Sequence, residues 1–411
     1  MTSRNGSRTP KSRSSTRSAT CLKSARAPSA SAIPQRIGLG RTHRGCGILP
    51  FARGRRPARS SSTYGLTMER GAPRLVALAL ASALVVLSAC ASGGDDAATT
   101  GAGSSEGPAS GPTASTGSQT ADIEATIEVG ADPIGVAAGE GSIWVVNAEI
   151  NAKHGTVSRV DPMTNEVDAT IDVGAIPLEV AVGEGGVWVS NSGDDTVSVI
   201  DPANNDVVDT LEVCAAPEGL AVADGPVWVV CENDGVVARI DPTSGQMGKP
   251  IDVGLQPRFV TVAFDNVWVS SYFDGTITRI DPTTEKAVAQ IETDQGPQIM
   301  AEAGGLLWVS CTDTDTVQAI DPSTNEVVAT VDAPVAPDGL AFDGTTLWVA
   351  TELGPELAGI DPAAQDVVAS ATVAEHGLIN ANQVMVFEDG SLWLPILDDG
   401  TFLRVSPPAV S

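Results

Sequence analysis

Hydrophobic and polar positions alternate in short runs through residues 121–411, and turn residues separate the runs. In residues 218–257, the runs are 220–222, 227–230, 236–240 and a last one that ends near Val253. The turns between them are rich in Asp, Asn, Gly and Pro. Short alternating runs bounded by such residues are typical of antiparallel strands. Each repeat therefore predicts a four-stranded antiparallel sheet.

One tryptophan marks each copy of this repeat. The seven are Trp144, Trp188, Trp228, Trp268, Trp308, Trp348 and Trp393, and their spacings are 44, 40, 40, 40, 40 and 45 residues. A fixed period of this length indicates a repeat architecture. One large ring per sheet, beside Val or Leu, is what packing between neighbouring sheets requires. The pattern predicts an all-β fold, a seven-bladed β-propeller with four antiparallel strands per blade.

The two ends of the repeat region complement each other. The last repeat contains three runs, 384–387, 392–396 and 401–405, whereas residues 123–133 match the end of a repeat such as 167–177. We expect this N-terminal strand to complete the last blade, which closes the ring and removes its open edge. A closed propeller of this kind can be a monomer.

An Asp-Pro pair recurs between the third and fourth runs. The six pairs begin at Asp161, Asp201, Asp241, Asp281, Asp321 and Asp361. An Asp side chain accepts hydrogen bonds from backbone amides just downstream, and Pro presets φ for the turn. These carboxylates are therefore interpreted as structural.

The phrase PxxxAVxxGxVWVSNxxDxTVxxIDPxTNxVVxTIxVG summarises the repeat and resembles the YVTN-type repeats of YncE-like bacterial propellers. The resemblance covers residues 121–407. It implies the propeller fold but little about function, because propellers carry many unrelated activities.

The chain ahead of the propeller divides into three segments. Residues 1–67 hold fourteen Lys or Arg and no Asp or Glu, and they predict a disordered extension. Residues 68–90 have a basic start, a thirteen-residue apolar run and the tetrad LSAC, as in a bacterial export signal. The tetrad resembles the lipobox of lipoproteins, which implies that Cys90 carries a lipid. Residues 91–120 are rich in Gly, Ser, Thr and Ala and predict a flexible tether.

These segments predict a lipid-anchored protein at the cell membrane, facing outside the cytoplasm. An ordinary signal peptide and an anchor that is never cleaved are the alternatives for residues 68–90. If Met68 is the true start, residues 1–67 are a mis-assigned extension; the other interpretation is an Arg- and Ser-rich transit peptide.

Removing these segments leaves a strongly acidic protein. Of 24 Lys and Arg, fourteen precede residue 68 and two lie in the signal segment, so eight remain beside 50 Asp and Glu, a formal charge of −42. Such a surface repels nucleic acid and favours a cationic or neutral partner.

The first candidate site is a ring of residues near the channel mouth, one from the start of each blade. The ring reads Ile134, Leu178, Glu218, Arg258, Gln298, Asp338 and Gln383, and its five polar members are the ligand-binding candidates. The alternative is a solvated channel entrance filled with water.

A second candidate lies in two longer loops, 148–156 and 373–383. They hold His154 and His376, with Glu149 and Glu375 beside them and Asp398 nearby. A His and carboxylate pair can act as acid and base or bind a divalent metal, whereas a lone surface His is usually only solvated. HGLI at 376–379 resembles one phrase of virginiamycin B lyase, a propeller that uses a His, a Glu and magnesium. The resemblance carries over His376 alone.

Three cysteines follow the lipobox: Cys214, Cys231 and Cys311. No CxxC pair indicates a metal site. Cys214 and Cys231 end neighbouring strands and can form a disulfide in an oxidising compartment. The alternative is that Cys231 and Cys311 are small buried residues.

The sequence thus favours a non-enzymatic binding or scaffold propeller that offers its top face to a small ligand or a protein. No cofactor is expected for that function. The alternative is a metal-assisted small-molecule lyase or hydrolase centred on His376.

Overall fold

A computed structural model describes residues 119–222, 225–352, 354–373, 385–397 and 400–410. They all belong to the second of two compact units, Ser105–Ser411. The predicted signal segment, Cys90 and most of the tether lie outside the described residues, as do His376, Glu375, Gln383 and Asp398. In the described part of the chain, no helix has the length and hydrophobicity needed to cross a membrane.

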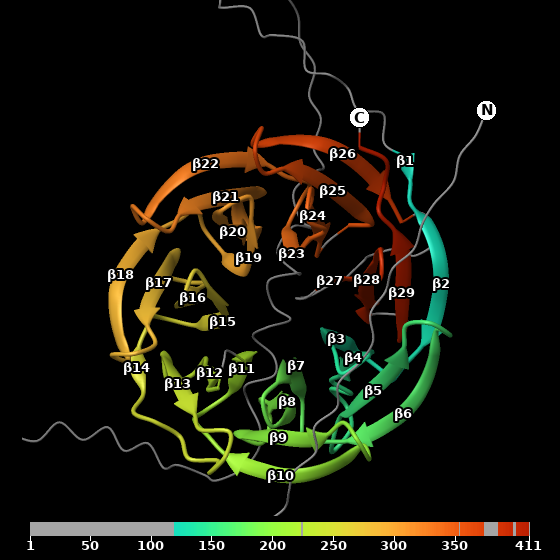
Figure 1. The fold of residues 1–411 in the computed structure, drawn as a ribbon, viewed down its shortest axis with the longest axis vertical. Coiled ribbons are helices and arrows are strands. Elements are labelled where there is room, and N and C mark those ends of the chain that lie inside the picture. Colours follow the sequence, from blue (N-terminus) through green and yellow to red (C-terminus); the bar gives the residue numbers. More distant parts are fainter. Residues whose placement is uncertain (1–118, 223–224, 353, 374–384, 398–399, 411) are drawn as a thin grey trace, which may run out of the picture. The chain divides into compact units, whose positions relative to one another are not determined.

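Seven sheets, each with four antiparallel strands, form a closed ring, which confirms the predicted propeller (Figure 1); one sheet carries a fifth, parallel strand at its outer edge. Blade 1 contains β3 (Pro133–Gly139), β4 (Ser142–Asn147), β5 (Thr156–Asp161) and β6 (Glu166–Asp172). Blade 2 contains β7 (Pro177–Gly183), β8 (Gly186–Asn191), β9 (Thr196–Asp201) and β10 (Asp206–Glu212). Blade 3 contains β11 (Pro217–Val222), β12 (Val227–Cys231), β13 (Val236–Ile240) and β14 (Ile251–Asp252). Blade 4 contains β15 (Pro257–Ala263), β16 (Asn266–Ser271), β17 (Thr276–Asp281) and β18 (Lys286–Glu292).

The remaining blades follow the same order. Blade 5 contains β19 (Pro297–Ala303), β20 (Leu306–Cys311), β21 (Thr316–Asp321) and β22 (Glu326–Asp332), with the 3-10 helix η2 (Thr312–Thr314) after β20. Blade 6 contains β23 (Pro337–Phe342), β24 (Leu347–Thr351), β25 (Glu356–Asp361) and β26 (Asp366–Thr372). Blade 7 contains β27 (Val386–Glu388), β28 (Ser391–Ile396) and β29 (Thr401–Ser406).

The ring closes through its N-terminal strand, as predicted. β2 (Asp122–Glu128) pairs antiparallel with β29, from Asp122 opposite Ser406 to Glu128 opposite Thr401. A further short strand, β1 (Gln119–Thr120), pairs parallel with β26. Each blade thus places its first strand nearest the central axis and its fourth at the rim (Figure 1).

Blade 3 departs from the regular repeat at its rim. Its fourth strand, β14, has two residues, whereas the fourth strands of the neighbouring blades have seven. Gly248 and Pro250 stand just before β14. Gly weakens a strand and Pro cannot donate to the ladder, so an isolated bridge between Met247 and Ile240 is followed by an interruption, and the ladder with β13 resumes at Ile251.

The tryptophans form the contacts between blades, which confirms their predicted packing role. All seven are at most 1% exposed, and they pack among Val, Leu and Ile side chains of adjacent blades. In six blades the indole Nε1 also donates a hydrogen bond to the last residue of the first strand or to the turn that follows it. Each of these indoles therefore fills the space between two neighbouring sheets and stabilises the first turn of its own sheet.

The six Asp-Pro turns behave as predicted. In each turn the Asp Oδ1 accepts a hydrogen bond of 2.7–3.0 Å from the backbone amide two residues downstream. This is the Asx-turn geometry, so these carboxylates are structural.

Three arginines each link their own blade to the next one, which the sequence pattern did not predict. The Arg159 guanidinium lies 5.0 Å from the Trp144 ring. It also donates to the carbonyl of Pro202 at 2.7 Å and to Asn205 at 2.9 Å, in the turn of the next blade. Arg279 and Arg404 make the equivalent contacts. In blade 3, Arg239 instead forms a half-exposed ion pair with Glu285, at 2.9 Å.

We predict that Arg159→Ala lowers the free energy of unfolding by about 1–3 kcal/mol, because it removes a cation–π contact and three charge-assisted hydrogen bonds, one of them to Ser142 in its own blade. The matched control Arg239→Ala removes an exposed ion pair and should cost under about 1 kcal/mol. Urea unfolding followed by tryptophan fluorescence measures both. Equal losses of unfolding free energy in the two variants would contradict the role assigned to Arg159 in holding blades 1 and 2 together.

Candidate functional site

The polar ring residues lie at the start of the first strand of successive blades. Glu218, Arg258, Gln298 and Asp338 each follow the proline that begins β11, β15, β19 or β23. A residue with positive φ precedes every one of these prolines: Ala216, Gln256, Gly296 and Ala336, with φ between 52° and 73°. This turn occurs in blades 3 to 6 alike, so it belongs to the fold and directs the following residue toward the centre.

The first strands of neighbouring blades approach closely at this level. A Cβ added to Gly219 would lie 2.5 Å from the carbonyl oxygen of Arg258. Only glycine tolerates such an approach between two backbones. The ring side chains are buried as a result: Glu218 is 4% exposed, Gln298 2% and Asp338 0%. A channel entrance filled with water stays the alternative interpretation of this ring.

Arg258 is at the centre of the charged part of the ring. Its Nη1 lies 3.9 Å from Oε1 of Glu218, and its guanidinium lies 4.7 Å from the Tyr272 ring. Burial opposes its charge, but Glu218, Glu232, Tyr272 and Asp338 together raise the pKa of Arg258. The arginine is therefore a fixed cation among carboxylates.

Asp338 is the most deeply buried carboxyl group of the ring. Neither of its oxygens accepts a hydrogen bond from the described residues. Burial and then the charge of Glu352 raise its pKa well above the ordinary value; Arg258 opposes this and Glu218 adds to it. Burial also raises the pKa of Glu352. Both carboxyl groups therefore stay protonated above the ordinary range, because burial disfavours their charged forms.

Glu179 joins this cluster although it lies outside the predicted ring. It is 4% exposed; its Oε1 accepts a hydrogen bond from the Val180 amide at 3.0 Å, and Oε2 accepts none from the described residues. Burial, with a smaller contribution from Glu218, raises the pKa of Glu179 to about 8 against the Val180 hydrogen bond. In β7 the strand pairing resumes at Glu179, the second residue after the proline. In β11 it resumes one residue later, at Leu220.

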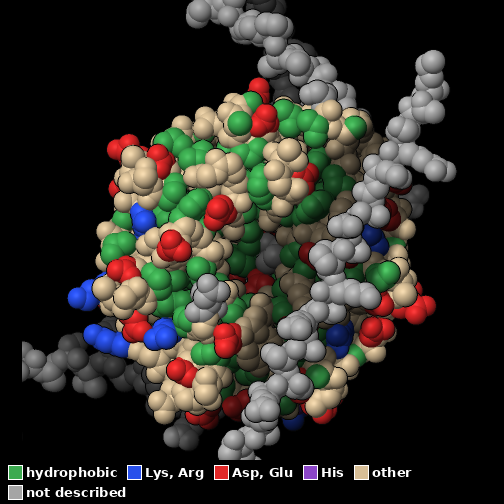
Figure 2. Space-filling view, in the orientation of Figure 1, with side chains coloured by type: hydrophobic (Ala, Val, Ile, Leu, Met, Phe, Trp, Pro, Cys, Tyr) green, Lys and Arg blue, Asp and Glu red, His purple; other side chains and the backbone are tan. Residues whose placement is uncertain are grey.

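Gln298 connects the ring to the next blade. Its Nε2 donates to Oγ1 of Thr312 at 3.3 Å, and that hydroxyl donates to the carbonyl of Pro337 at 2.9 Å. The Gln298 Oε1 accepts no hydrogen bond among the described residues. The site therefore runs from blade 2 to blade 6. Figure 2 shows a hollow at the centre of one face of the ring, with acidic side chains around it.

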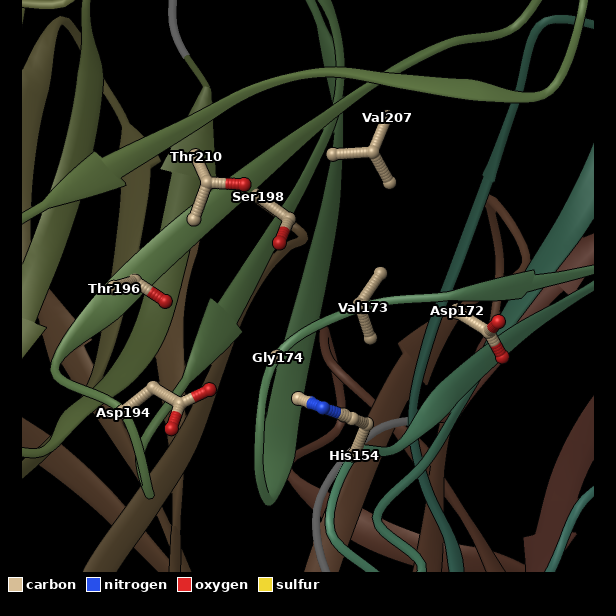
Figure 3. A pocket seen from close by; sticks show the side chains of 9 residues that line it. All are labelled: His154, Asp172, Val173, Gly174, Asp194, Thr196, Ser198, Val207 and Thr210. Atoms are coloured by element: carbon tan, nitrogen blue, oxygen red, sulfur yellow. The ribbon is translucent and has the colours of Figure 1, made fainter.

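His154, from the second predicted site, lies in a different place. It lines an open groove of about 440 Å³ between blades 1 and 2, with Asp172, Asp194 and Thr196 among its neighbours (Figure 3). Glu149 accepts a hydrogen bond of 2.9 Å from the Thr156 hydroxyl. No group of three or more His, Cys, Asp or Glu in the described ranges could hold a metal ion. The pairing of His154 with His376 stays a prediction, because His376 is outside those ranges.

The cysteines form one disulfide. Cys214 and Cys231 are bonded, with their Cα atoms 5.7 Å apart, and the bond ties the segment before β11 to the end of β12. Cys311 is free and buried, and burial raises the pKa of its thiol to about 12. A thiol of this kind is unreactive, so Cys311 is a packing residue.

The fold and the central site define a seven-bladed β-propeller with a buried, acid-rich channel mouth. No protein-family model and no curated protein matches the sequence, so the resemblance to YncE-like proteins stays a prediction.

Solved structures share the fold at low sequence identity. Hydrazine synthase of Kuenenia stuttgartiensis has 15% identity and a TM-score of 0.59, and covers 73% of this chain and 100% of its own. A streptogramin B lyase has 16% identity and a TM-score of 0.58, with 69% and 96% covered. The Cps50 (Swd1) β-propeller domain of Myceliophteria thermophila has 13% identity and a TM-score of 0.60, with 70% and 99% covered. At this level of identity the likeness shows the fold alone.

The raised pKa of Glu179 predicts a pH-dependent stability. Between its ordinary value of 4.5 and about 8 the folded protein binds more protons at this site than the unfolded chain does. Stability is therefore lost as pH rises through this window. We expect Glu179→Gln, which cannot ionise, to be more stable than the parent at pH 8 by on the order of 2–4 kcal/mol, with little difference near pH 4.5.

Urea unfolding of both proteins at half-unit steps of pH tests this expectation. The difference in unfolding free energy should grow steadily with pH. A constant difference would show that Glu179 titrates at its ordinary pKa in the folded protein.

Proposed function

We propose that this protein is a binding module whose ligand site is the channel mouth formed by Glu218, Arg258, Gln298 and Asp338, with Glu179 below them. The observation that carries the proposal is that acceptor atoms of Asp338, Glu179 and Gln298 are buried without protein partners in the described part of the chain. The two oxygens of Asp338, one of Glu179 and one of Gln298 accept no hydrogen bond from the described residues.

Structural requirements do not explain such a cluster. Buried polar groups in folded proteins are nearly always hydrogen-bonded, because each unpaired one costs about 1–3 kcal/mol. Leu178 and Ile134 show that apolar residues fit the equivalent ring position in blades 1 and 2. Charged residues that destabilise a fold are characteristic of sites that bind a ligand.

The same proposal includes the place where the protein acts. The tetrad LSAC and the Gly- and Ser-rich residues 91–120 support a lipid anchor on Cys90 and a tether that holds the propeller outside the cytoplasm. The disulfide between Cys214 and Cys231 fits an oxidising compartment. The ligand is a small molecule or part of a protein in that compartment.

Expression in a bacterial host that processes lipoproteins tests the anchor. The parent protein should incorporate a labelled fatty acid and sediment with membranes, whereas Cys90→Ala should incorporate none. Label retained in Cys90→Ala would contradict lipidation at this residue.

Stability measurements distinguish a ligand site from a structural ion-pair network. If the site is kept for a ligand, Asp338→Asn should raise the free energy of unfolding at pH 8 by about 1–3 kcal/mol, because it removes a buried carboxylate that lacks hydrogen bonds. The matched control in the same blade is Asp343→Asn. Asp343 accepts hydrogen bonds from the Thr345 and Thr346 amides and the Trp348 indole, so its replacement should destabilise the fold.

Chemical denaturation of the parent and both variants provides the comparison. A loss of stability in Asp338→Asn as large as that in Asp343→Asn would show that Asp338 is a structural counter-ion of Arg258. That result would overturn the proposed site.

A further inference from the structure

We infer that the channel mouth takes an organic cation, an alkyl- or arylammonium ion, whose charged nitrogen lies at Asp338 and whose apolar part lies against Phe273. The inference rests on the proposed function and names the class of ligand for that site. Three independent features of the described residues support it: the charge balance, the type of unpaired atom and the exposed aromatic surface.

The charge balance of the cluster leaves a place for a second cation. One guanidinium, that of Arg258, faces the carboxyl groups of Glu218, Glu232 and Asp338. Asp338 in turn faces Glu352, and Glu218 faces Glu179. Arg258 is the one cation named among these five carboxyl groups, so ionisation of the protonated ones favours a second, bound cation over an anion.

The unpaired atoms select a hydrogen-bond donor. Among the ring residues and Glu179, four buried acceptors have no partner in the described chain: both oxygens of Asp338, Oε2 of Glu179 and Oε1 of Gln298. The single unpaired donor there is Nε of Arg258. Asp338 is completely buried, so its carboxylate is not satisfied by bulk water. A primary ammonium group supplies three donors and no acceptor, as this set requires.

An aromatic pair beside Arg258 provides an apolar surface. Tyr272 lies beneath the guanidinium, and its hydroxyl donates to Asp313 at 2.7 Å. The Phe273 ring meets Tyr272 edge to face, with centroids 5.8 Å apart, and is 62% exposed. Leu255, 66% exposed, precedes β15 and lies beside the turn that holds Phe273, because its amide donates to Asp274 at 2.7 Å. These exposed side chains at the rim suit the alkyl or aryl part of an organic cation.

Binding of a cation at this site releases protons. The titratable groups that face Asp338 are Glu352 of its own blade, Arg258 of blade 4 and Glu218 of blade 3. Burial raises the pKa of Asp338 and of Glu352, so both retain protons above the ordinary range. A bound ammonium favours their ionised forms. Affinity should therefore increase as pH rises, by about tenfold per pH unit for each proton that is released, which is roughly 300-fold from pH 5.5 to pH 8 for one proton released over the full interval.

The experiment is isothermal titration calorimetry of the purified protein with n-hexylammonium, and with methylammonium, 1-hexanol and hexanoate as comparison probes. We expect hexylammonium to bind, 1-hexanol and hexanoate not to bind, and methylammonium to bind more weakly. Titrations at pH 7 in phosphate and in HEPES, whose ionisation enthalpies differ, should show proton release.

Three variants locate the binding. Asp338→Asn should weaken hexylammonium binding at least about tenfold, a loss of one charge-assisted contact. Phe273→Ser should weaken hexylammonium about fivefold and leave methylammonium unchanged, since it removes only the apolar contact. Asp343→Asn, which lies outside the site, should leave the affinity of the folded protein unchanged.

The outcomes separate this inference from the proposed function. Binding of hexanoate or 1-hexanol that Asp338→Asn abolishes would overturn the cation inference and support the binding site. Hexylammonium binding that is equal in the parent and in Asp338→Asn would show attraction to the acidic surface only, and would also overturn the inference. No binding by any probe, together with destabilisation by Asp338→Asn, would overturn both.

Discussion

The pairing of β2 with β29 is the interaction on which the rest of the structure depends. It joins residues from opposite ends of the folded region, Asp122 with Ser406, and converts seven sheets in a row into a closed ring. Within the ring, the tryptophans pack each blade against the next, and Arg159 and its two equivalents join three pairs of blades by hydrogen bonds. Closure leaves the blades no freedom to spread, and so the starts of their first strands must crowd around the axis.

That crowding gives the channel mouth its chemistry. Side chains that would be solvated on an open sheet are buried against one another, and the ring places Glu218, Arg258 and Asp338 within electrostatic reach. Burial raises the pKa of Asp338 and Glu179 and leaves several acceptors without protein partners. The fold tolerates these destabilising groups because the tryptophan contacts, which lie farther from the axis, stabilise the blades independently of the central residues.

The sequence predicted the fold and the positions of the ring residues because the repeat fixes position so strictly. A residue one place after the blade's first proline lies in the ring, so Glu218, Arg258, Gln298 and Asp338 could be found by counting. Glu179 was missed because a register shift that ends earlier moves it inward, although a charged residue at that position is a visible signal. The contacts of Arg159 and Arg279 with the next blade were missed because they join positions about forty-five residues apart, which no local pattern reveals. The roles of Cys90 and His376 stay predictions, since both residues lie outside the described part of the chain.

The central claim is that Asp338 and its neighbours hold a cationic ligand. A crystal structure of the protein grown with n-hexylammonium at pH 8 tests it most directly. The account predicts density for the ammonium nitrogen within hydrogen-bond distance, about 2.7–3.2 Å, of the Asp338 carboxylate, with the chain toward Phe273. The claim would be contradicted by Asp338 paired with Arg258 and ordered water alone, and the probe absent from the channel mouth.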